Sequence, residues 1–210
     1  AEQECRDFYV AELPGGRQLR LPIRVLADGE HALASLIVNQ ASFAVQEALA
    51  EALAARIADY DIDVVAGLPT LGLTLAAEVA RKLGHARYVP LGTSRKFWYD
   101  EALSVPLSSI TTQQAKRLYV DPRMLPLIEG RRVALVDDVI SSGASILAGL
   151  DLLASRGIAP VAIGTAILQS LRWRALLTVP GADWSGRIEG SFATPLLERG
   201  PDGLWYAPSP

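Results

Sequence analysis

The order of apolar and small residues at positions 133–153 constrains the fold more than any other feature of the sequence. An apolar run at residues 133–136 leads into Asp137 and Asp138, and a turn rich in serine and glycine follows. Beyond the turn, apolar residues recur at helical spacing, and a second apolar run occupies residues 160–168. Two strands joined by a helix in this way must be parallel, so the segment predicts a βαβ unit.

A second unit of the same kind precedes it. Residues 44–60 are expected to form a helix because apolar residues recur every fourth position, and Ser42 can cap its N-terminus. A strand at residues 61–67, a helix at residues 71–83 and a strand at residues 86–91 should follow. The two units predict an α/β fold with a doubly wound parallel β-sheet flanked by helices, in which ligands bind beyond the C-terminal ends of the strands.

The segment between the two units does not continue this alternation. Residues 97–107 and 116–120 have β-like composition, and the polar residues 108–114 join them. We therefore expect a long hairpin that forms a flap.

Both ends of the chain are expected to form a small hood. The 210 residues suffice for a single domain over residues 1–210. We place its core at about residues 43–170 and its hood at about residues 1–42 and 171–210. Residues 181–210 are rich in Gly, Pro and aromatic residues, which indicates irregular or hairpin structure packed on the core.

Composition and charge favour a soluble protein with a small-molecule partner. The chain is 50% hydrophobic with a net charge of −3, so bulk charge gives no attraction for nucleic acid or anionic lipid. The single cysteine, Cys5, excludes an internal disulfide and a thiolate metal cluster and is compatible with a reducing compartment. The acidic first residues are unlike a signal peptide, and no apolar run has the length of a membrane span. We expect a cytoplasmic protein without nucleic acid or membrane partners.

The turn after the Asp pair has the properties of a phosphate site. Backbone N–H groups of a small-residue turn at a helix N-terminus form a concave set of donors, to which serine hydroxyls add. Gly143 lets the backbone approach a ligand closely. Asp137 and Asp138 can accept hydrogen bonds from sugar hydroxyls, which predicts a sugar phosphate; either acid taken alone fits a turn or a helix cap equally well. The residues of the turn are Ser141, Ser142, Gly143, Ala144 and Ser145.

The whole pattern resembles the signature of the type I phosphoribosyltransferases, which bind 5-phosphoribosyl 1-pyrophosphate. That signature is an apolar strand, two acids, two variable residues and a phosphate loop of the form Thr/Ser-Gly-x-Thr/Ser. The resemblance implies that residues 141–145 bind the ribose 5-phosphate. It also implies that Asp137 and Asp138 hold the ribose hydroxyls and oppose positive charge at the anomeric carbon. The order of elements over residues 61–168 is similar to the family's core as well.

A second loop, within residues 63–72, is similar to the family's pyrophosphate loop, whose donors are mainly backbone amides. A strand there ends in a loop with Gly and Pro before a helix, although a plain βα turn has the same pattern. In the family such loops often hold a cis peptide bond that does not involve proline. It is not a dinucleotide GxGxxG motif, because only Gly67 and Gly72 are present. The candidate residues are Leu68, Pro69, Thr70 and Leu71.

Arg95 and Lys96 resemble the family's basic pair, and Lys96 is the better candidate for a pyrophosphate contact. A basic pair alone also fits a solvated surface. Residues 97–99, all aromatic, would belong to a flap that excludes water from the reacting centre. The alternative for these aromatic residues is a strand in the core.

The resemblance implies displacement of pyrophosphate by a ring nitrogen of a base through an oxocarbenium-like state. Mg²⁺ would bridge the pyrophosphate and ribose oxygens and be held mainly by the substrate, so no protein metal site is expected. Catalysis would rest on placed charge and excluded solvent, in agreement with the absence of a Ser-His or Cys-His pattern. His31 and His85 are interpreted as ordinary residues.

The base is expected to be a purine. Residues 36–40 look like the Asn-x-Gln element of xanthine phosphoribosyltransferases without its middle residue, which makes Asn39 a candidate for base recognition. Helix capping by Asn39 or Ser42 fits the same residues. The long flap is closer to the adenine and xanthine branch, and relatives commonly form homodimers.

Two other functions fit parts of the pattern. A regulator of the same fold that senses 5-phosphoribosyl 1-pyrophosphate would keep the phosphate loop, but the chain has no separate helix-turn-helix domain. An unrelated α/β enzyme could use the Asp pair for magnesium in phosphoryl transfer. That enzyme would need a GxxxxGKS or GxxxxGKT loop, which is absent.

Overall fold

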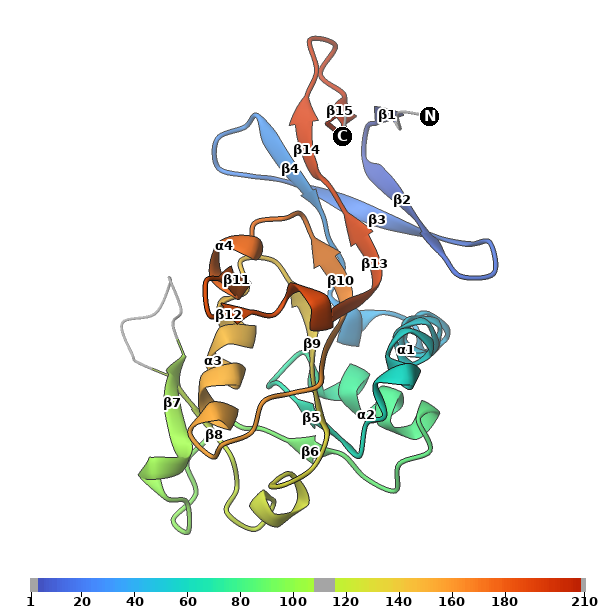
Figure 1. Cartoon of the computed structure of the whole chain (residues 1–210). Coiled ribbons are helices and arrows are strands. Elements are labelled where there is room, and N and C mark those ends of the chain that lie inside the picture. Colours follow the sequence, from blue (N-terminus) through green and yellow to red (C-terminus); the bar gives the residue numbers. More distant parts are fainter. Residues whose placement is uncertain (1–3, 108–115, 209–210) are drawn as a thin grey trace.

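A five-stranded parallel sheet forms the centre of the computed structural model, which describes residues 4–107 and 116–208 (Figure 1). The strand order is β13-β10-β9-β5-β6, and every neighbouring pair is parallel. The strands are β5 (Val64–Gly67), β6 (Val89–Pro90), β9 (Val133–Ile140), β10 (Ala162–Gln169) and β13 (Ile188–Thr194). The order confirms the predicted doubly wound sheet.

Helices cover both faces of this sheet, as Figure 1 shows. Helices α1 (Phe43–Ile57) and α2 (Leu73–Lys82) pack together on one face, and α3 (Ala144–Ala154) packs on the other. The Ser42 hydroxyl accepts a hydrogen bond from the Val45 amide at 3.3 Å, which confirms the predicted cap of α1. The shorter helices are η1 (Val38–Gln40), η2 (Ala58–Tyr60), η3 (Glu101–Leu103), η4 (Leu125–Leu127), α4 (Arg174–Leu177) and η5 (Ser185–Arg187).

The predicted flap contains an antiparallel pair, β7 (Ser104–Leu107) and β8 (Lys116–Tyr119), which packs against α3. The prediction of a strand over residues 97–107 is wrong for its first half, because residues 97–100 form a turn and loop ahead of η3. The polar run predicted to join the strands, residues 108–114, lies outside the described residues.

Both ends of the chain contribute to the hood, a six-stranded sheet with the order β1-β15-β14-β4-β3-β2 (Figure 1). All of its pairs are antiparallel. Its strands are β1 (Glu4–Cys5), β2 (Phe8–Leu13), β3 (Arg17–Val25), β4 (His31–Ala34), β14 (Leu196–Arg199) and β15 (Trp205–Tyr206). The predicted contribution of both termini to one hood is therefore confirmed.

The placement of all of residues 171–210 in the hood is wrong in one respect. Strand β13 lies inside that range but pairs with β10 and extends the parallel core sheet. Its buried residues include small ones such as Gly190 and Ser191, so it lacks the apolar pattern that marks the other core strands. A short hairpin of β11 (Thr178–Val179) and β12 (Ala182–Asp183) precedes it.

Within the part of the chain that the structure describes, no helix combines the length and the apolar character needed to cross a membrane.

Candidate functional site

The Asp pair lies within strand β9, because this strand continues to Ile140 and does not end at Val136 as predicted. Pairing with β10 carries the strand through the acids, and Asp137 lies opposite Thr165. Asp137 is 6% exposed, while Asp138 is half-buried. The Asp138 amide donates to Oδ1 of Asp137 at 2.8 Å, so the first carboxylate is held against its own backbone.

Burial raises the pKa of Asp137 well above its ordinary value, and the neighbouring Asp138 carboxyl raises this pKa further. The hydrogen bond from the Asp138 amide lowers the same pKa and offsets part of the effect. A charged Asp137 is therefore unfavourable in the folded chain until a donor or cation approaches it. Ligand hydroxyls at this position would supply such donors.

The loop after β5 lies directly against the Asp pair. A Cβ atom added at Gly72 would fall 2.7 Å from Oδ1 of Asp137 and 2.9 Å from its Cα atom, so only glycine permits this approach. The peptide bond between Pro69 and Thr70 is cis. A cis bond of this kind is the feature named above for the pyrophosphate loops that this loop resembles. Thr70 and Leu71 are exposed and can offer amides to a ligand.

Leu68, also predicted as a ligand residue of this loop, has a different role. Its amide donates to the Val136 carbonyl at 2.9 Å, and its side chain is 1% exposed in the core. The amide is thus already paired across the sheet, and Pro69 has no amide hydrogen. The amides of the loop that could still bind a ligand are therefore those beyond Pro69.

The predicted phosphate loop joins β9 to the N-terminus of α3. Gly143 adopts φ 86°, a left-handed conformation that favours glycine, and the α3 helix begins at Ala144. The first amides of a helix have no acceptor within it, so they point outward at this loop. Ser142 and Ser145 are exposed, and the Ser142 hydroxyl accepts from the Ala144 amide at 3.3 Å. The loop thus has the geometry of an anion site.

Arg172 is a residue of this site that the sequence analysis missed. Its Nη2 atom donates to the Ser141 hydroxyl at 2.7 Å. It lies just beyond the C-terminal end of β10, the neighbour of β9 in the sheet. A basic residue soon after a predicted parallel strand lies at the ligand-binding edge, and this position in the sequence was the available signal.

The basic pair follows β6 and lies on the surface. Arg95 forms an ion pair with Glu101 at 3.0 Å, and Lys96 is exposed. The alternative of an aromatic core strand is wrong, because Phe97 is 95% exposed in a turn. The Trp98 ring donates to Asp121 at 3.3 Å, outside the sheet. Among the described residues, Lys96 forms no hydrogen bond or ion pair with either loop.

The hood reaches the same edge of the sheet at the end of β10. The Gln169 side chain donates to the Ala34 carbonyl at 3.0 Å, which ties the last residue of β4 to the C-terminal end of β10. Asn39, five positions further on, has a buried Oδ1 atom without a hydrogen-bond partner among the described residues. A buried acceptor of this kind needs a donor, and a ligand N–H group would provide one.

The described residues contain no group of three or more His, Cys, Asp or Glu side chains placed to hold a metal ion. Nδ1 of His31 lies 2.7 Å from the Asp28 carboxylate, and Nε2 of His85 lies 3.0 Å from the Ile62 carbonyl. Local structure thus provides a partner for one ring nitrogen of each histidine.

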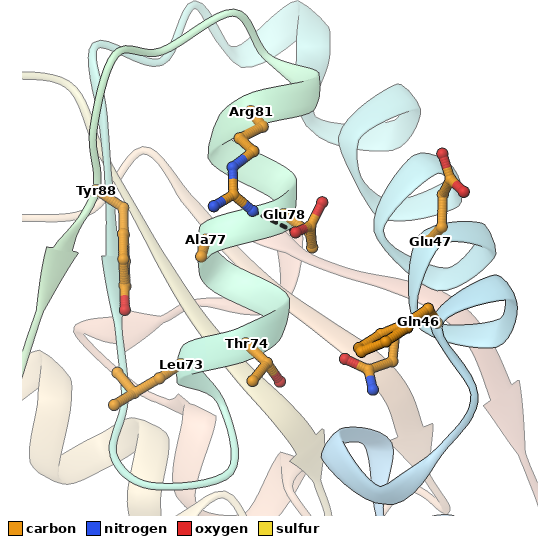
Figure 2. Close-up of a pocket in the computed structure, with 9 residues that line it drawn as sticks. Gln46, Glu47, Leu73, Thr74, Ala77, Glu78, Arg81 and Tyr88 are labelled. Atoms are coloured by element: carbon orange, nitrogen blue, oxygen red, sulfur yellow. Dashed lines mark hydrogen bonds and ion pairs between the residues drawn. The ribbon is translucent and has the colours of Figure 1, made fainter.

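A pocket of about 560 Å³ opens between α1 and α2, and Figure 2 shows its lining. Gln46 and Glu47 come from α1, and the ion pair of Glu78 with Arg81 comes from α2. Its lining contains no residue of the Asp pair or the phosphate loop. The candidate site is therefore the edge formed by the two loops and not this pocket.

Comparison with known proteins identifies a protein family that matches this chain. The family described as phosphoribosyl transferase domain matches residues 36–176, which include both loops and Arg172. A hypoxanthine/guanine phosphoribosyltransferase of Methanosalsum zhilinae is 36% identical over 101 residues, or 48% of this chain and 49% of that protein. An adenine phosphoribosyltransferase of Neisseria meningitidis serogroup B is 34% identical over 109 residues, or 52% of this chain and 55% of that protein. The chain thus spans about half the length of these curated relatives.

The fold has a counterpart among solved structures. The adenine phosphoribosyltransferase from Giardia lamblia, solved with 9-deazaadenine, has a TM-score of 0.61 at 19% identity. The similarity covers 89% of this chain and 93% of that one, so it extends over the hood as well as the parallel core.

Proposed function

The chain belongs to the phosphoribosyl transferase domain family, and from this premise we propose that it transfers the 5-phosphoribosyl group of 5-phosphoribosyl 1-pyrophosphate to a purine base. In the proposed reaction a ring nitrogen of the base forms a bond to the anomeric carbon. The bond from that carbon to pyrophosphate breaks, pyrophosphate leaves with the electron pair, and the base loses its proton to solvent.

The observation that best supports the proposal is the position of the Asp pair between the two loops. Gly72 brings the first loop against Asp137, and the second loop begins only a few residues after the same acid. The amides of the two loops can donate to anions, and the Asp pair between them can accept from hydroxyls. A ligand with an anionic group at each end and hydroxyls in between matches this arrangement. A sugar that carries a 5-phosphate and a 1-pyrophosphate is such a ligand.

We assign the roles accordingly. Residues 141–145 bind the 5-phosphate, and the exposed amides of Thr70 and Leu71 bind the pyrophosphate with help from Lys96. Asp137 and Asp138 accept hydrogen bonds from the ribose hydroxyls. Their negative charge opposes the positive charge that develops at the anomeric carbon, a placed electrostatic stabilisation that needs no nucleophilic side chain.

Mg²⁺ fits this site as an ion carried by the substrate. Two adjacent carboxylates offer hard oxygen atoms, while the described residues offer no cage of three or more acidic or His side chains. When bound through pyrophosphate and ribose oxygens, the ion would supply positive charge beside the leaving group. Asp137 and Asp138 would hold the ion's waters through their carboxylate oxygens.

We assign base recognition to the hood beside Asn39. The unpaired Oδ1 atom of Asn39 and the tie between Gln169 and Ala34 support a polar pocket at this edge. A purine offers N–H groups to such an acceptor. We propose adenine or a 6-oxopurine such as xanthine as the base.

Pyrophosphate release from magnesium and 5-phosphoribosyl 1-pyrophosphate, measured with each of six bases, tests the proposal. The bases are adenine, guanine, hypoxanthine, xanthine, orotate and uracil. Release should depend on a purine and fall by about 100-fold or more in Asp138→Asn, the range for loss of one placed transition-state charge. Sugar pyrophosphate binding without turnover on any base would support a regulator instead, and absence of binding would contradict both functions.

A further inference from the structure

We propose that Arg172 is a sugar-phosphate binding residue that supplies the positive charge of the 5-phosphate subsite. This inference rests on the proposed function and adds to it a residue outside the loop itself. The loop and the helix that follows it, residues 141–154, contain no lysine or arginine. A phosphate dianion bound there by amides and hydroxyls alone would keep most of its charge uncompensated.

Arg172 is placed to compensate it. Its Nη2 atom lies 2.7 Å from the Ser141 hydroxyl, and its Nε atom lies 3.4 Å from the Ser170 hydroxyl. A guanidinium carries five N–H donors in a planar fork, so donors remain for a phosphate oxygen after these two contacts. The side chain is exposed, so a ligand can reach it.

The turn that carries Arg172 is fixed to the loop by packing. Ser170 has φ 62°, unusual for a residue with a side chain, and its carbonyl accepts from the Trp173 ring at 3.2 Å. Trp173 and Leu177 are buried, and a Cβ atom added at Gly143 would lie 3.4 Å from Trp173 Cβ and 3.1 Å from Leu177 Cγ. The segment after β10 therefore packs directly on the phosphate loop.

A substitution of Arg172 should therefore affect only one of the two anion loops. Arg172 donates a hydrogen bond to Ser141, whereas in the described part of the chain it forms no hydrogen bond or ion pair with residues 68–72. Its loss should weaken the binding of a 5-phosphate and spare the binding of pyrophosphate. A purely structural role in holding the fold would weaken both.

Titration calorimetry on the full chain with ribose 5-phosphate and, separately, with pyrophosphate and magnesium tests the inference. Arg172→Gln should raise the Kd for ribose 5-phosphate by about 10- to 100-fold, the range for one charged hydrogen bond, with the Kd for pyrophosphate changed by less than about twofold. Arg172→Lys, which keeps the charge and is the safer variant for folding, should recover part of the loss. Arg174→Gln removes an exposed arginine two positions away, whose guanidinium lies over the Trp173 ring, and should bind both ligands as the unchanged protein does.

Three outcomes overturn the inference. Unchanged binding of ribose 5-phosphate by Arg172→Gln would limit Arg172 to a surface contact. Equal losses for both ligands in Arg172→Gln and Arg172→Lys would indicate a structural role. If the unchanged protein itself bound neither ribose 5-phosphate nor pyrophosphate, the proposed function would fail first, and the assignment of Arg172 with it.

Discussion

The two candidate anion loops follow neighbouring parallel strands, yet an acid lies beside one and a base beside the other. The loop after β5, residues 68–72, lies against the buried carboxyl of Asp137 at Gly72. The loop after β9, residues 141–145, accepts a hydrogen bond from the guanidinium of Arg172. The same strand-loop-helix geometry therefore does not provide the same electrostatics.

This difference has a consequence for the ligand. The loop beside the acid is the one assigned to pyrophosphate, the more highly charged of the two anions. Under the proposed function, positive charge at this loop would come from Mg²⁺ carried by the substrate and from Lys96. The loop assigned to the 5-phosphate has Arg172 hydrogen-bonded to Ser141, so under the same proposal it would depend on neither of them.

The largest expected effect is on the pH dependence of the free energy of unfolding when the carboxyl group of Asp137 is removed. The pKa of Asp137 in the folded chain is raised above its ordinary value of 3.8. At a pH between 3.8 and the raised pKa, the folded chain therefore binds more protons than the unfolded chain. The contribution of protonated Asp137 to the free energy of unfolding is fully present below pH 3.8. It is lost as the pH rises through the pKa of the folded chain. The slope reaches about 1.4 kcal/mol per pH unit for one proton.

Asp137→Asn should remove this slope from the free energy of unfolding, measured by urea denaturation from pH 4 to pH 9 without ligand or metal. The asparagine Oδ1 can still accept from the Asp138 amide, so the variant keeps the local hydrogen bond. Asp151→Asn, an exposed change on α3, is the matched control and should leave the slope in place. Identical slopes for Asp137→Asn and the unchanged protein would show that the charge of Asp137 is not costly.

Gly72→Ala tests the close contact on the acid side. Its Cβ would meet Asp137 and the Leu68 carbonyl at 2.7 Å, and the latter is a backbone atom that cannot rotate away. We expect unfolding free energy to fall by about 2 to 3 kcal/mol, the upper part of the range for overpacking. Gly92→Ala, with open space around the added Cβ, is the control in the same denaturation experiment. A loss no larger than that of the control would mean that the loop can move away from Asp137.

Gly143→Ala makes the corresponding change on the arginine side. The added Cβ would meet only the side chains of Leu177 and Trp173, at 3.1 Å or more, and the residue would have to keep φ 86°. The left-handed conformation costs an alanine about 1 to 2 kcal/mol, so the loss should be smaller than for Gly72→Ala. Urea denaturation of both variants under the same conditions shows which loses more unfolding free energy. A larger loss for Gly143→Ala than for Gly72→Ala would contradict the comparison of the two loops.

The sequence predicted the parts of the fold and of the site that depend on local pattern. The strand before Asp137, the glycine at position 143 and the Ser42 cap follow from short-range spacing, and the structure contains all three. The amide of Leu68 could not be assigned from its loop, because its acceptor is the Val136 carbonyl on another strand.

The remaining features depend on packing between distant segments. Strand β13 is defined by its pairing with β10 and not by an apolar pattern of its own. Arg172 contacts Ser141 from a turn in which Ser170 has φ 62°. Neither the pairing nor the turn leaves a periodic signal in the sequence.

Lys96→Gln gives the smallest expected effect and tests where the pyrophosphate loop obtains its charge. Lys96 is exposed, so its interaction with an anion is screened by solvent and worth about 1 kcal/mol or less. By calorimetry with magnesium, we expect the Kd for pyrophosphate to rise by about threefold to fivefold and the Kd for ribose 5-phosphate to stay the same. Arg95→Gln is the matched control, because Arg95 is already paired with Glu101 and should contribute less. If Lys96→Gln weakened ribose 5-phosphate as much as pyrophosphate, its charge would act on both loops alike, and the contrast between a loop with its own cation and a loop without one would no longer hold.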